Sequence, residues 1–448
     1  MTPETEPLHL KVDRMGRNGE GVAVLPDGRV AFIGGALPGE IVEARIGEHH
    51  ARYARGQAVA VLDRSPERRL PPCPVYWECG GCTFQHWSYE AEGAYKVDRV
   101  REALARIGGV EAHVAPLRAP QYPYRYRTKA SFPWTGTPGQ AALGLYGRKS
   151  HQVVATDRCL IQDPMLDDLL SAAVLAANAL KLEPYDEVGG RGVLRHLVLR
   201  ASHTDHRTVV LVVVTRRDPR LKVWAERLMA AVDHLQGVAL SVQRERTNKV
   251  LGGPAETLAG RPVLHEQLAG MVFEVGADVF FQVNPGQMES LLDVMTEEVG
   301  PGRGRLALDL YAGVGVLGLL MSRAGYRVTA VESSSRAVAS GRASARDNGL
   351  AIEFRTGAVE EVLPPLIEGG YRPDLVVLDP PRSGVRPVVA ATLLDAAPSR
   401  IIYVSCDPET LARDVALWQS LYEVRTVAPV DLFPRTDHVE TVLTLVRR

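Results

Sequence analysis

The sequence of 448 residues has few cysteines, few aromatic side chains and no long apolar run. Its five cysteines are an odd number, which does not suggest the paired disulfides of a small secreted protein, so we expect reduced thiols. The longest strongly apolar stretch, "VVLVVV" at 209–214, is much shorter than the roughly 20 residues that cross a bilayer. The N-terminus, "MTPETEPLHL", lacks the basic start and apolar core of a signal peptide. We therefore expect a cytoplasmic protein without a membrane partner.

The chain also lacks an excess of charge of either sign, with 52 Lys and Arg against 53 Asp and Glu. The net charge therefore does not indicate a polyanionic partner. Locally, residues 96–158 contain eleven Lys and Arg against four Asp and Glu. This excess indicates either a surface that binds phosphate groups or solvated helix faces. Nothing in the composition indicates an obligate protein partner.

The length exceeds the usual size of one hydrophobic core, and the pattern of elements predicts three regions. Short alternating segments between Gly and Pro turns in 1–62 predict a small β-barrel of the OB type. Residues 63–280 predict a β-rich central domain that contains a cysteine cluster and a helix near 88–107. In 281–448, short Val/Ile/Leu-rich runs alternate with helical patterns, which is typical of an open, mostly parallel α/β sheet.

Residues of functional types follow four predicted strands of this α/β region. They are Asp309 with Tyr311, Glu332, Asp379 and Cys406. Ligands of open parallel sheets lie outside the carboxyl ends of the strands, so these side chains should meet at one edge. Their convergence is stronger evidence for a site than any one motif.

A glycine-rich turn, "GVGVLG" at 313–318, follows the first of these strands and is by itself a weak signal. Together with Glu332 on the next strand it suits the ribose of either a dinucleotide or S-adenosylmethionine, so an NAD-dependent oxidoreductase is a rival interpretation. The segment "LDPPRSG" at 378–384 favours a methyltransferase. Its Asp-Pro-Pro presents a rigid backbone edge with few donors beside a carboxylate, which suits a flipped nucleobase facing a methyl donor.

Cys406 lies where a predicted strand ends and a predicted helix begins. The partial positive charge of a helix N-terminus favours a thiolate, so we expect a lowered pKa and a nucleophile rather than an inert buried thiol. A thiolate that adds to carbon 6 of a pyrimidine makes carbon 5 reactive toward a methyl donor. A base must then remove the proton from carbon 5. Glu440 is the candidate base, on one face with His438 in a predicted strand over 437–446.

With these motifs the chain resembles, nearly end to end, the RNA uracil-C5 methyltransferase family, whose members make 5-methyluridine in ribosomal or transfer RNA. The resemblance implies a Rossmann-like S-adenosylmethionine-dependent methyltransferase domain, a barrel that is an RNA-binding TRAM domain, and a helix at 88–107 that packs on the catalytic domain. The most specific matching segments are "FFQVNPGQ" (280–287), "DLYAGVG" (309–315), "LDPPRSG" (378–384), "VSCDPETLARD" (404–414) and "FPRTDHVET" (433–441).

The same resemblance implies roles for single residues. Cys406 is expected to be the nucleophile, and Glu440 is expected to accept the proton. The residues expected to line the site of S-adenosylmethionine and the target base are Gln282, Tyr311, Glu332 and Asp379.

The other four cysteines form a separate set, with Cys73, Cys79 and Cys82 close together and Cys159 farther along the chain. Four thiolates suit either tetrahedral zinc or an iron–sulfur cluster, and their spacing leaves both open. Many members of the family carry a 4Fe–4S cluster on this pattern, so the resemblance favours a cluster that staples the central domain.

The segment "YPYRYRTKASFPW" at 122–134 interleaves aromatic and basic side chains. This pattern suits RNA with splayed bases or a half-buried strand, and in this context we favour RNA contact. The barrel favours 23S ribosomal RNA as the substrate, since bacterial transfer-RNA members typically lack it. The alternatives are a transfer-RNA enzyme, an RNA cytosine-C5 methyltransferase (disfavoured because the Asp-Pro motif lacks its second cysteine), the NAD enzyme, and a non-catalytic RNA-binding protein.

Overall fold

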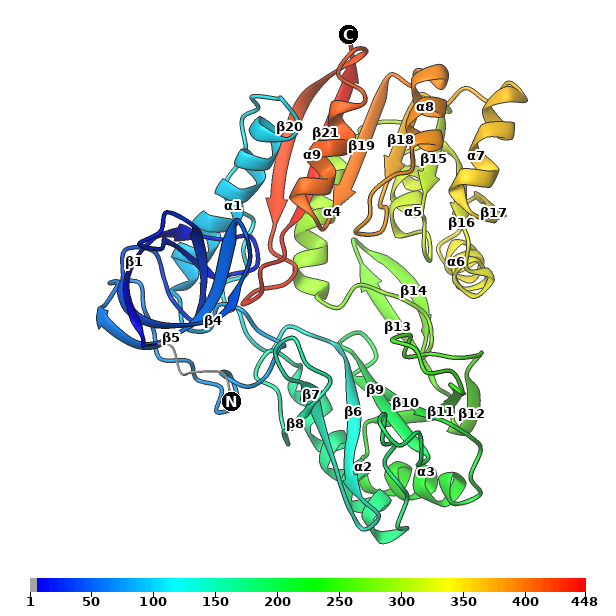
Figure 1. Ribbon diagram of the computed structural model, residues 1–448. Helices are drawn as coiled ribbons and strands as arrows, with labels where there is room; N and C mark the ends of the chain where they lie inside the picture. The colour runs from blue at the N-terminus through cyan, green and yellow to red at the C-terminus, as the bar shows by residue number, and fades with distance from the viewer. Residues whose placement is uncertain (1–5) are drawn as a thin grey trace.

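The computed structural model describes residues 6–448. Residues 1–5, which begin both the predicted barrel region and the segment without signal-peptide features, lie outside the described part. The chain builds a barrel, a central sheet and a C-terminal sheet with helices on both faces (Figure 1). Among residues 6–448 there is no helix of the length and apolarity that a membrane crossing requires.

The N-terminal region is a closed five-stranded barrel, which confirms the prediction of an OB-like fold. Its strands are β1 (Leu8–Met15), β2 (Gly21–Val24), β3 (Val30–Gly34), β4 (Ile41–His49) and β5 (Tyr53–Asp63). The strand order is β1-β2-β3-β5-β4, and pairing of β1 with β4 closes the barrel. Alternate side chains such as Val12, Ile33 and Val42 fill the interior.

The central sheet has seven strands in the order β12-β11-β10-β9-β6-β7-β8. Its strands are β6 (Lys129–Thr137), β7 (Gln140–Tyr146), β8 (Val153–Ala155), β9 (Leu194–Ser202), β10 (Arg207–Val214), β11 (Leu235–Val242) and β12 (Glu256–Gly260). Residues Leu194–Ser202 are buried throughout because one face packs on helices and the other on apolar side chains such as Leu264. The helices are the short η1 (Pro164–Leu166), α2 (Asp167–Ala179) and α3 (Arg220–Ala231).

A two-stranded hairpin connects the central sheet to the C-terminal sheet (Figure 1). It consists of β13 (Val263–Leu268) and β14 (Met271–Gly276). Phe273 and Val275 lie in the core of the C-terminal region, whereas Leu264 packs with residues of the central sheet. The hairpin falls within the expected central domain, yet its side chains belong to both cores.

The C-terminal region is an open seven-stranded sheet in the order β17-β16-β15-β18-β19-β21-β20. Its strands are β15 (Leu306–Leu310), β16 (Arg327–Glu332), β17 (Ile352–Thr356), β18 (Leu375–Leu378), β19 (Arg400–Ser405), β20 (Tyr422–Val430) and β21 (Glu440–Arg447). The helices are α4 (Pro285–Val299), α5 (Val316–Arg323), α6 (Ser335–Asp347), α7 (Val359–Glu368), α8 (Pro387–Ala396) and α9 (Pro408–Ala416). The first five strands of the order are parallel, and β21 runs antiparallel to β19. This arrangement confirms the Rossmann-like α/β prediction.

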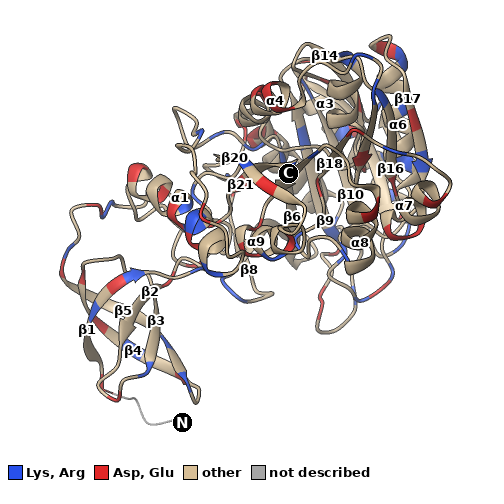
Figure 2. Cartoon of the chain, turned by 90° about the horizontal axis from the view of Figure 1, so that it is seen from above, with Lys and Arg blue, Asp and Glu red and all other residues tan. Residues whose placement is uncertain are grey.

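Helix α1 (Tyr89–Arg106) precedes the central sheet in the chain but packs on the C-terminal region. It begins after Ser88, whose hydroxyl accepts a hydrogen bond from the Ala91 N–H at 3.2 Å. Val100 and Leu104 share one apolar core with Trp418 of the C-terminal region. Figure 2 shows the barrel standing to one side of the two larger sheets.

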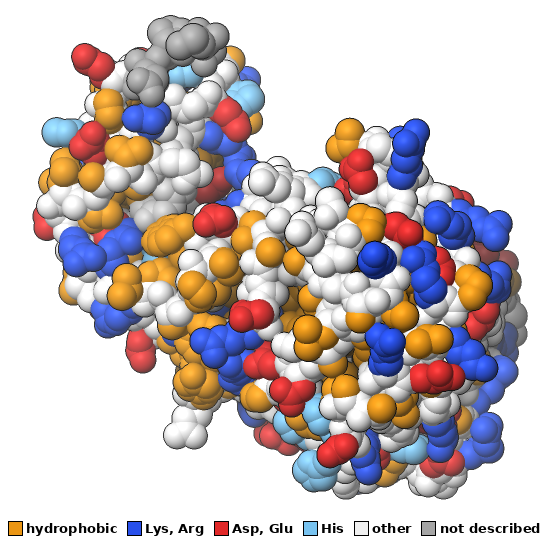
Figure 3. All heavy atoms as spheres, turned by 90° about the horizontal axis from the view of Figure 1, so that it is seen from below, with side chains coloured by type: hydrophobic (Ala, Val, Ile, Leu, Met, Phe, Trp, Pro, Cys, Tyr) orange, Lys and Arg blue, Asp and Glu red, His pale blue; other side chains and the backbone are white. Residues whose placement is uncertain are grey.

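The local excess of basic residues does not form a free cationic surface. Figures 2 and 3 show Lys and Arg interspersed with Asp and Glu. Burial lowers the pKa of Lys129 to about 7, and like charges on Arg200 and Arg127 lower it further. The basic residues of this segment that form ion pairs are Lys96, Arg99, Arg101, Arg106, Arg118, Arg125 and Lys149.

The predicted aromatic RNA contact over 122–134 is largely wrong. Phe132 and Trp134 lie in the core of the central sheet, with 0% and 3% of their surface exposed. The Tyr126 hydroxyl donates a hydrogen bond to the carbonyl of Pro434. Tyr122 alone among the five aromatic residues of this segment is exposed. The segment is therefore the largely buried start of β6 and the loop that precedes it.

Candidate active site

A cavity of about 840 Å³ opens at the carboxyl edge of the parallel strands. It forms where the strand order reverses between β15 and β18, the place at which open α/β sheets bind ligands. Its lining includes all the residues predicted for cofactor and catalysis, which are Gln282, Tyr311, Glu332, Asp379, Cys406 and Glu440.

The glycine turn after β15 is built around a buried carboxylate. Asp309 accepts a hydrogen bond from the Gly318 N–H at 2.8 Å, and burial raises the pKa of Asp309 to about 8. A Cβ at Gly318 would lie 2.8 Å from the same carboxylate oxygen, so a side chain there would displace it. Gly315 has a φ of 79° and lies against the ring of Phe354.

Glu332, at the end of β16, fixes the other side of this turn. One carboxylate oxygen accepts from the Gly313 N–H at 2.9 Å, and the other accepts from the Ser334 N–H at 2.7 Å. Tyr311 has a φ of 63°, an uncommon conformation for a residue with a side chain, and its hydroxyl donates to Glu360. A carboxylate has about four acceptor positions, so Glu332 can still accept from a ribose hydroxyl.

Asp379 follows β18 and is half-buried in the cavity lining. Burial raises its pKa to about 7, so near neutral pH the carboxyl group can either donate or accept a hydrogen bond. The prolines Pro380 and Pro381 lie beside it in the lining and have no backbone N–H to donate. This edge therefore presents few hydrogen-bond donors other than the carboxyl group itself.

Cys406 lies between the end of β19 and the helix cap Asp407, which accepts a hydrogen bond from the Thr410 N–H. The expectation of a lowered pKa is wrong for the free protein. Burial raises the pKa of the Cys406 thiol to about 12, and the Glu440 carboxylate raises it further, while Arg382 opposes the rise. The thiol is therefore protonated until its surroundings change.

Glu440 reaches the same edge because β21 runs opposite to β19. The last pair of that ladder is Ser405 with Thr441, so the next residues outward are Cys406 and Glu440. Burial raises the pKa of Glu440 to about 8, with a further contribution from Asp379 and an opposing one from Arg382. The raised pKa means that the Glu440 carboxylate, once ionised, binds a proton more strongly than an ordinary carboxylate does, which suits a general base.

Arg382 is a residue of the site that the sequence patterns did not predict. Its guanidinium donates a hydrogen bond to Nε2 of His438 at 3.0 Å, so that nitrogen must be unprotonated. Burial also lowers the pKa of His438. The position of Arg382 within "LDPPRSG" was the available signal, because it follows Asp379 by three residues in the loop after the strand.

The four remaining cysteines line a second, smaller cavity of about 180 Å³. Cys79 and Cys82 are buried, while Cys73 and Cys159 are partly buried. In the described residues, 6–448, no group of three or more His, Cys, Asp or Glu side chains is already arranged to hold a metal ion. What the structure shows of the four cysteines is that they line one cavity.

Comparison with protein families identifies two parts of the chain. A family model described as tRNA (uracil-5-)-methyltransferase matches residues 224–448. A model of the TRAM domain matches residues 6–59, which is nearly the whole barrel.

Curated relatives are similar over almost the whole chain. An uncharacterized RNA methyltransferase of Gloeobacter violaceus is 38% identical, and the match covers 98% of this chain and 96% of that protein. One of Halalkalibacterium halodurans is 35% identical, with the same coverage of each chain. Among solved structures, a tRNA (uracil-54, C5)-methyltransferase of Pyrococcus abyssi in complex with S-adenosyl-L-homocysteine has a TM-score of 0.77 at 24% identity. That match covers 98% of this chain and 100% of the other, so the two share a fold.

We predict that iodoacetamide alkylates Cys406 slowly near pH 8 in the free protein. Because the pKa of the thiol is raised to about 12, the rate should increase about tenfold per pH unit up to about pH 10. Glu440→Gln removes a negative charge and should speed alkylation near pH 10. Glu360→Gln, which changes another carboxylate of the same cavity, is the control. Mass spectrometry of the Cys406 peptide gives the rate, and a plateau below pH 8 would contradict the raised pKa.

Proposed function

We propose that this protein, which belongs to the tRNA (uracil-5-)-methyltransferase family, acts through a covalent Cys406–RNA adduct. Its activity is that of an S-adenosylmethionine-dependent RNA uracil-C5 methyltransferase. The observation that carries this proposal is the antiparallel pairing of β19 and β21, which places a thiol and a carboxyl group beside each other in the large cavity. Family membership also sets aside the NAD-dependent alternative.

In the proposed reaction the Cys406 thiol first loses its proton to water, and its sulfur forms a bond to carbon 6 of the uracil. The electrons of the C5–C6 double bond move to the oxygen on carbon 4. Carbon 5 then takes the methyl group from the sulfonium, and S-adenosylhomocysteine leaves as a neutral thioether. Glu440 removes the remaining proton from carbon 5, the double bond re-forms, and the bond between sulfur and carbon 6 breaks.

The raised pKa values in the free site support a mechanism in which Cys406 becomes a nucleophile only after the substrate binds. With a pKa near 12 the thiol is a poor nucleophile, and Arg382 provides the positive charge that opposes this rise. Glu440 has the opposite character, since a pKa near 8 makes it a competent base once water is excluded by bound RNA. The neutral His438, which accepts a hydrogen bond from Arg382, then positions the guanidinium group and does not act as the base.

We predict different failures for the two catalytic substitutions. Cys406→Ala should lower methyl transfer at least about a thousandfold, because no covalent activation of carbon 5 remains. Glu440→Gln should still attack and methylate but stall before elimination, so a protein–RNA adduct should accumulate on a denaturing gel. An RNA containing 5-fluorouridine should trap the unmodified enzyme in the same way. Full activity of Cys406→Ala would end the covalent proposal, and an active Glu440→Gln without adduct would assign the base elsewhere.

For the methyl donor, we propose that Gln282, Tyr311, Glu332 and Asp379 hold S-adenosylmethionine. They line one cavity, and Glu332 lies on the strand after the glycine turn, where an acidic residue can accept from ribose hydroxyls. The adjoining part of the cavity, beside Pro380 and Cys406, then remains for the flipped base.

For the RNA, we propose a uridine of 23S ribosomal RNA as the first candidate, on the basis of the TRAM barrel. A transfer RNA is the second candidate, and two observations favour it. The matching family model is described by transfer RNA, and the Pyrococcus abyssi enzyme, named for a transfer-RNA uridine, shares the fold over 98% of this chain. The barrel therefore does not by itself separate the two substrates.

We predict that 23S ribosomal RNA from a strain without this protein lacks at least one 5-methyluridine. The purified enzyme should restore it in vitro, and mass spectrometry of nuclease fragments gives its position. Transfer RNA from the same strain is the internal comparison. Loss of 5-methyluridine from transfer RNA alone would select the second candidate.

We also propose that Cys73, Cys79, Cys82 and Cys159 hold a 4Fe–4S cluster. The residues fit such a group, since four soft donors surround a cavity of about 180 Å³. Zinc bound by the same four thiolates is the alternative, and the metal content separates the two. When bound, the cluster would tie the segment around Cys82 to the central domain; no step of the methyl transfer involves it.

We predict that protein purified without air is brown and contains about four irons per chain. Cys79→Ser should lower the iron content and the visible absorbance. Cys406→Ser should leave both unchanged, because Cys406 lines the other cavity. Stoichiometric zinc without visible absorbance would contradict the cluster assignment.

A further inference from the structure

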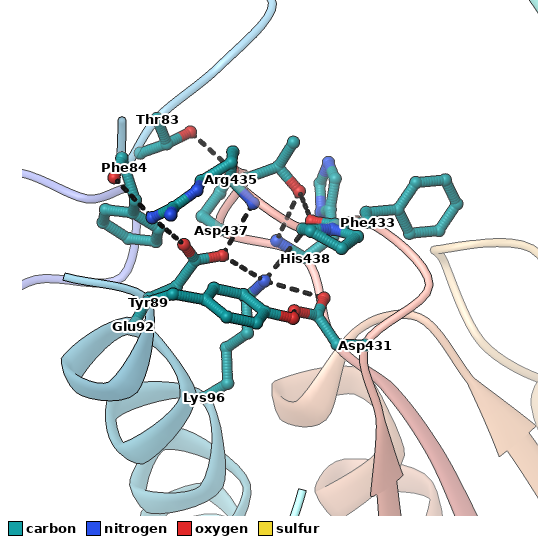
Figure 4. Close-up of polar contacts among 12 residues, drawn as sticks. Thr83, Phe84, Tyr89, Glu92, Lys96, Asp431, Phe433, Arg435, Asp437 and His438 are labelled. Carbon is teal, nitrogen blue, oxygen red and sulfur yellow. Dashed lines mark hydrogen bonds and ion pairs between the residues drawn. The ribbon is translucent and has the colours of Figure 1, made fainter. Parts of the chain in front are cut away.

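A group of buried charges lies outside the cavity, where α1 meets the segment 431–439 that leads into Glu440 (Figure 4). Glu92, Lys96 and Asp431 are 0% exposed, and Arg435 is 8% exposed. Two positive and two negative groups in such a place are costly unless each is paired and hydrogen-bonded. None of them lines the cavity, so the mechanism described above does not use them.

Lys96 connects helix α1 to this segment through all three of its donors. Its Nζ lies 2.7 Å from Glu92 Oε1, 2.8 Å from Asp431 Oδ1 and 3.3 Å from the carbonyl oxygen of Phe433. The Tyr89 hydroxyl donates to the other oxygen of Asp431 at 2.7 Å. An ammonium group has three donors, so Lys96 is fully used here.

Arg435 is fixed from the opposite side. Its backbone N–H donates to Glu92 Oε1 at 2.8 Å, and its carbonyl oxygen accepts from the backbone N–H groups of Thr83 and Phe84 at 2.8 and 3.1 Å. Its guanidinium lies over the rings of Tyr89 and Tyr124, at 5.0 and 5.1 Å. The residue has a φ of 67°, so contacts on both sides hold an unfavourable turn in place.

These contacts fix the backbone that precedes Glu440. Asn284 donates to the carbonyl of Leu432 at 3.0 Å, and Arg99 donates to the carbonyl of Asp437 at 2.6 Å. The Glu440 carboxyl group itself has no hydrogen-bond partner within residues 6–448. Its pKa is set by burial and by the charges of Asp379 and Arg382. Its position therefore depends on where this backbone is held.

We propose that Lys96, with Glu92 and Tyr89, is a positioning residue for Glu440: helix α1 holds the segment 431–437 so that the carboxylate faces carbon 5 of the adduct. This inference rests on the proposed roles of Cys406 and Glu440. Sub-ångström to ångström misplacement of a catalytic group costs as much as about a hundredfold in rate, so loss of this hold should impair the base more than cofactor binding.

The test is Lys96→Met, assayed with S-adenosylmethionine and RNA in a single turnover and normalised to folded protein. It should accumulate the covalent protein–RNA adduct, as is predicted for Glu440→Gln, and lower the rate constant for conversion of adduct to product at least about tenfold. The Kd for S-adenosylmethionine, measured by calorimetry, should change less than about twofold, since Lys96 contacts none of the residues proposed to hold that cofactor. A purely structural role would lower adduct and product together.

Arg68→Met is the matched control, because it breaks another buried ion pair, between Arg68 and Glu40 of the barrel region. It should lower the melting temperature without raising the adduct. If Lys96→Met does not fold, Tyr89→Phe replaces it, because this change removes only the hydroxyl that contacts Asp431. More adduct than in the wild type supports the proposal, and the same amount contradicts it. Adduct in Glu440→Gln but not in the folded Lys96 or Tyr89 variants overturns this inference alone. No adduct in Glu440→Gln overturns the proposed base first.

Discussion

The site depends on one constraint, the antiparallel pairing of the last strand, β21, with the parallel strand β19. Parallel strands alone would bring residue types such as Asp379 and Cys406 to the cavity at their carboxyl ends. Reversing β21 adds a residue from the start of a strand, Glu440, to the same edge. A thiol directly after β19 and a carboxyl group on the first residue of β21 thus become neighbours.

The same geometry explains why the pKa of each group is raised. Burial is the main cause for both; the Glu440 carboxylate further raises the pKa of the Cys406 thiol, and Asp379 further raises the pKa of Glu440. The positive charge of Arg382 lowers both pKa values, and its guanidinium donates a hydrogen bond to the neutral Nε2 of His438. A resting enzyme of this kind keeps its nucleophile protonated, which protects the thiol from oxidation and alkylation when no RNA is bound.

The chain also uses its N-terminal part to complete the C-terminal site. Helix α1 buries Val100 and Leu104 against the C-terminal core and brings Lys96 to the segment before Glu440. Thr83 and Phe84, which follow Cys82, contact the same segment through the carbonyl of Arg435. The cysteine cavity and the segment 431–439 that leads into Glu440 are therefore adjacent in space although they are far apart in sequence.

Much of the site could be predicted because strand ends have a simple rule. Asp309, Glu332, Asp379 and Cys406 each follow or end a short apolar run, and parallel strands bring such positions together. The thiol pKa could not be predicted in this way. A helix N-terminus is one local effect on the thiol, whereas its burial and the charge of Glu440 come from elements distant in sequence.

Two further misses have the same physical origin. Phe132 and Trp134 belong to a segment in which aromatic and basic residues are interleaved, and only their packing with residues of α2 and α3 shows them to be core. Lys96 begins a segment rich in Lys and Arg, which suggests an exposed charge. Its spacing from Glu92 and Val100 places all three on one helix face, which is the signal that was available for a buried charge.

The most direct measurement of the central claim is a crystal structure of the enzyme trapped on an RNA that contains 5-fluorouridine at the target position. The account predicts a bond from Cys406 Sγ to carbon 6, with a Glu440 carboxylate oxygen about 3–3.5 Å from the substituents of carbon 5. Lys96 should still contact Asp431 and the carbonyl of Phe433 in that structure. A bond from another residue, or a Glu440 side chain turned away from carbon 5, would contradict the account.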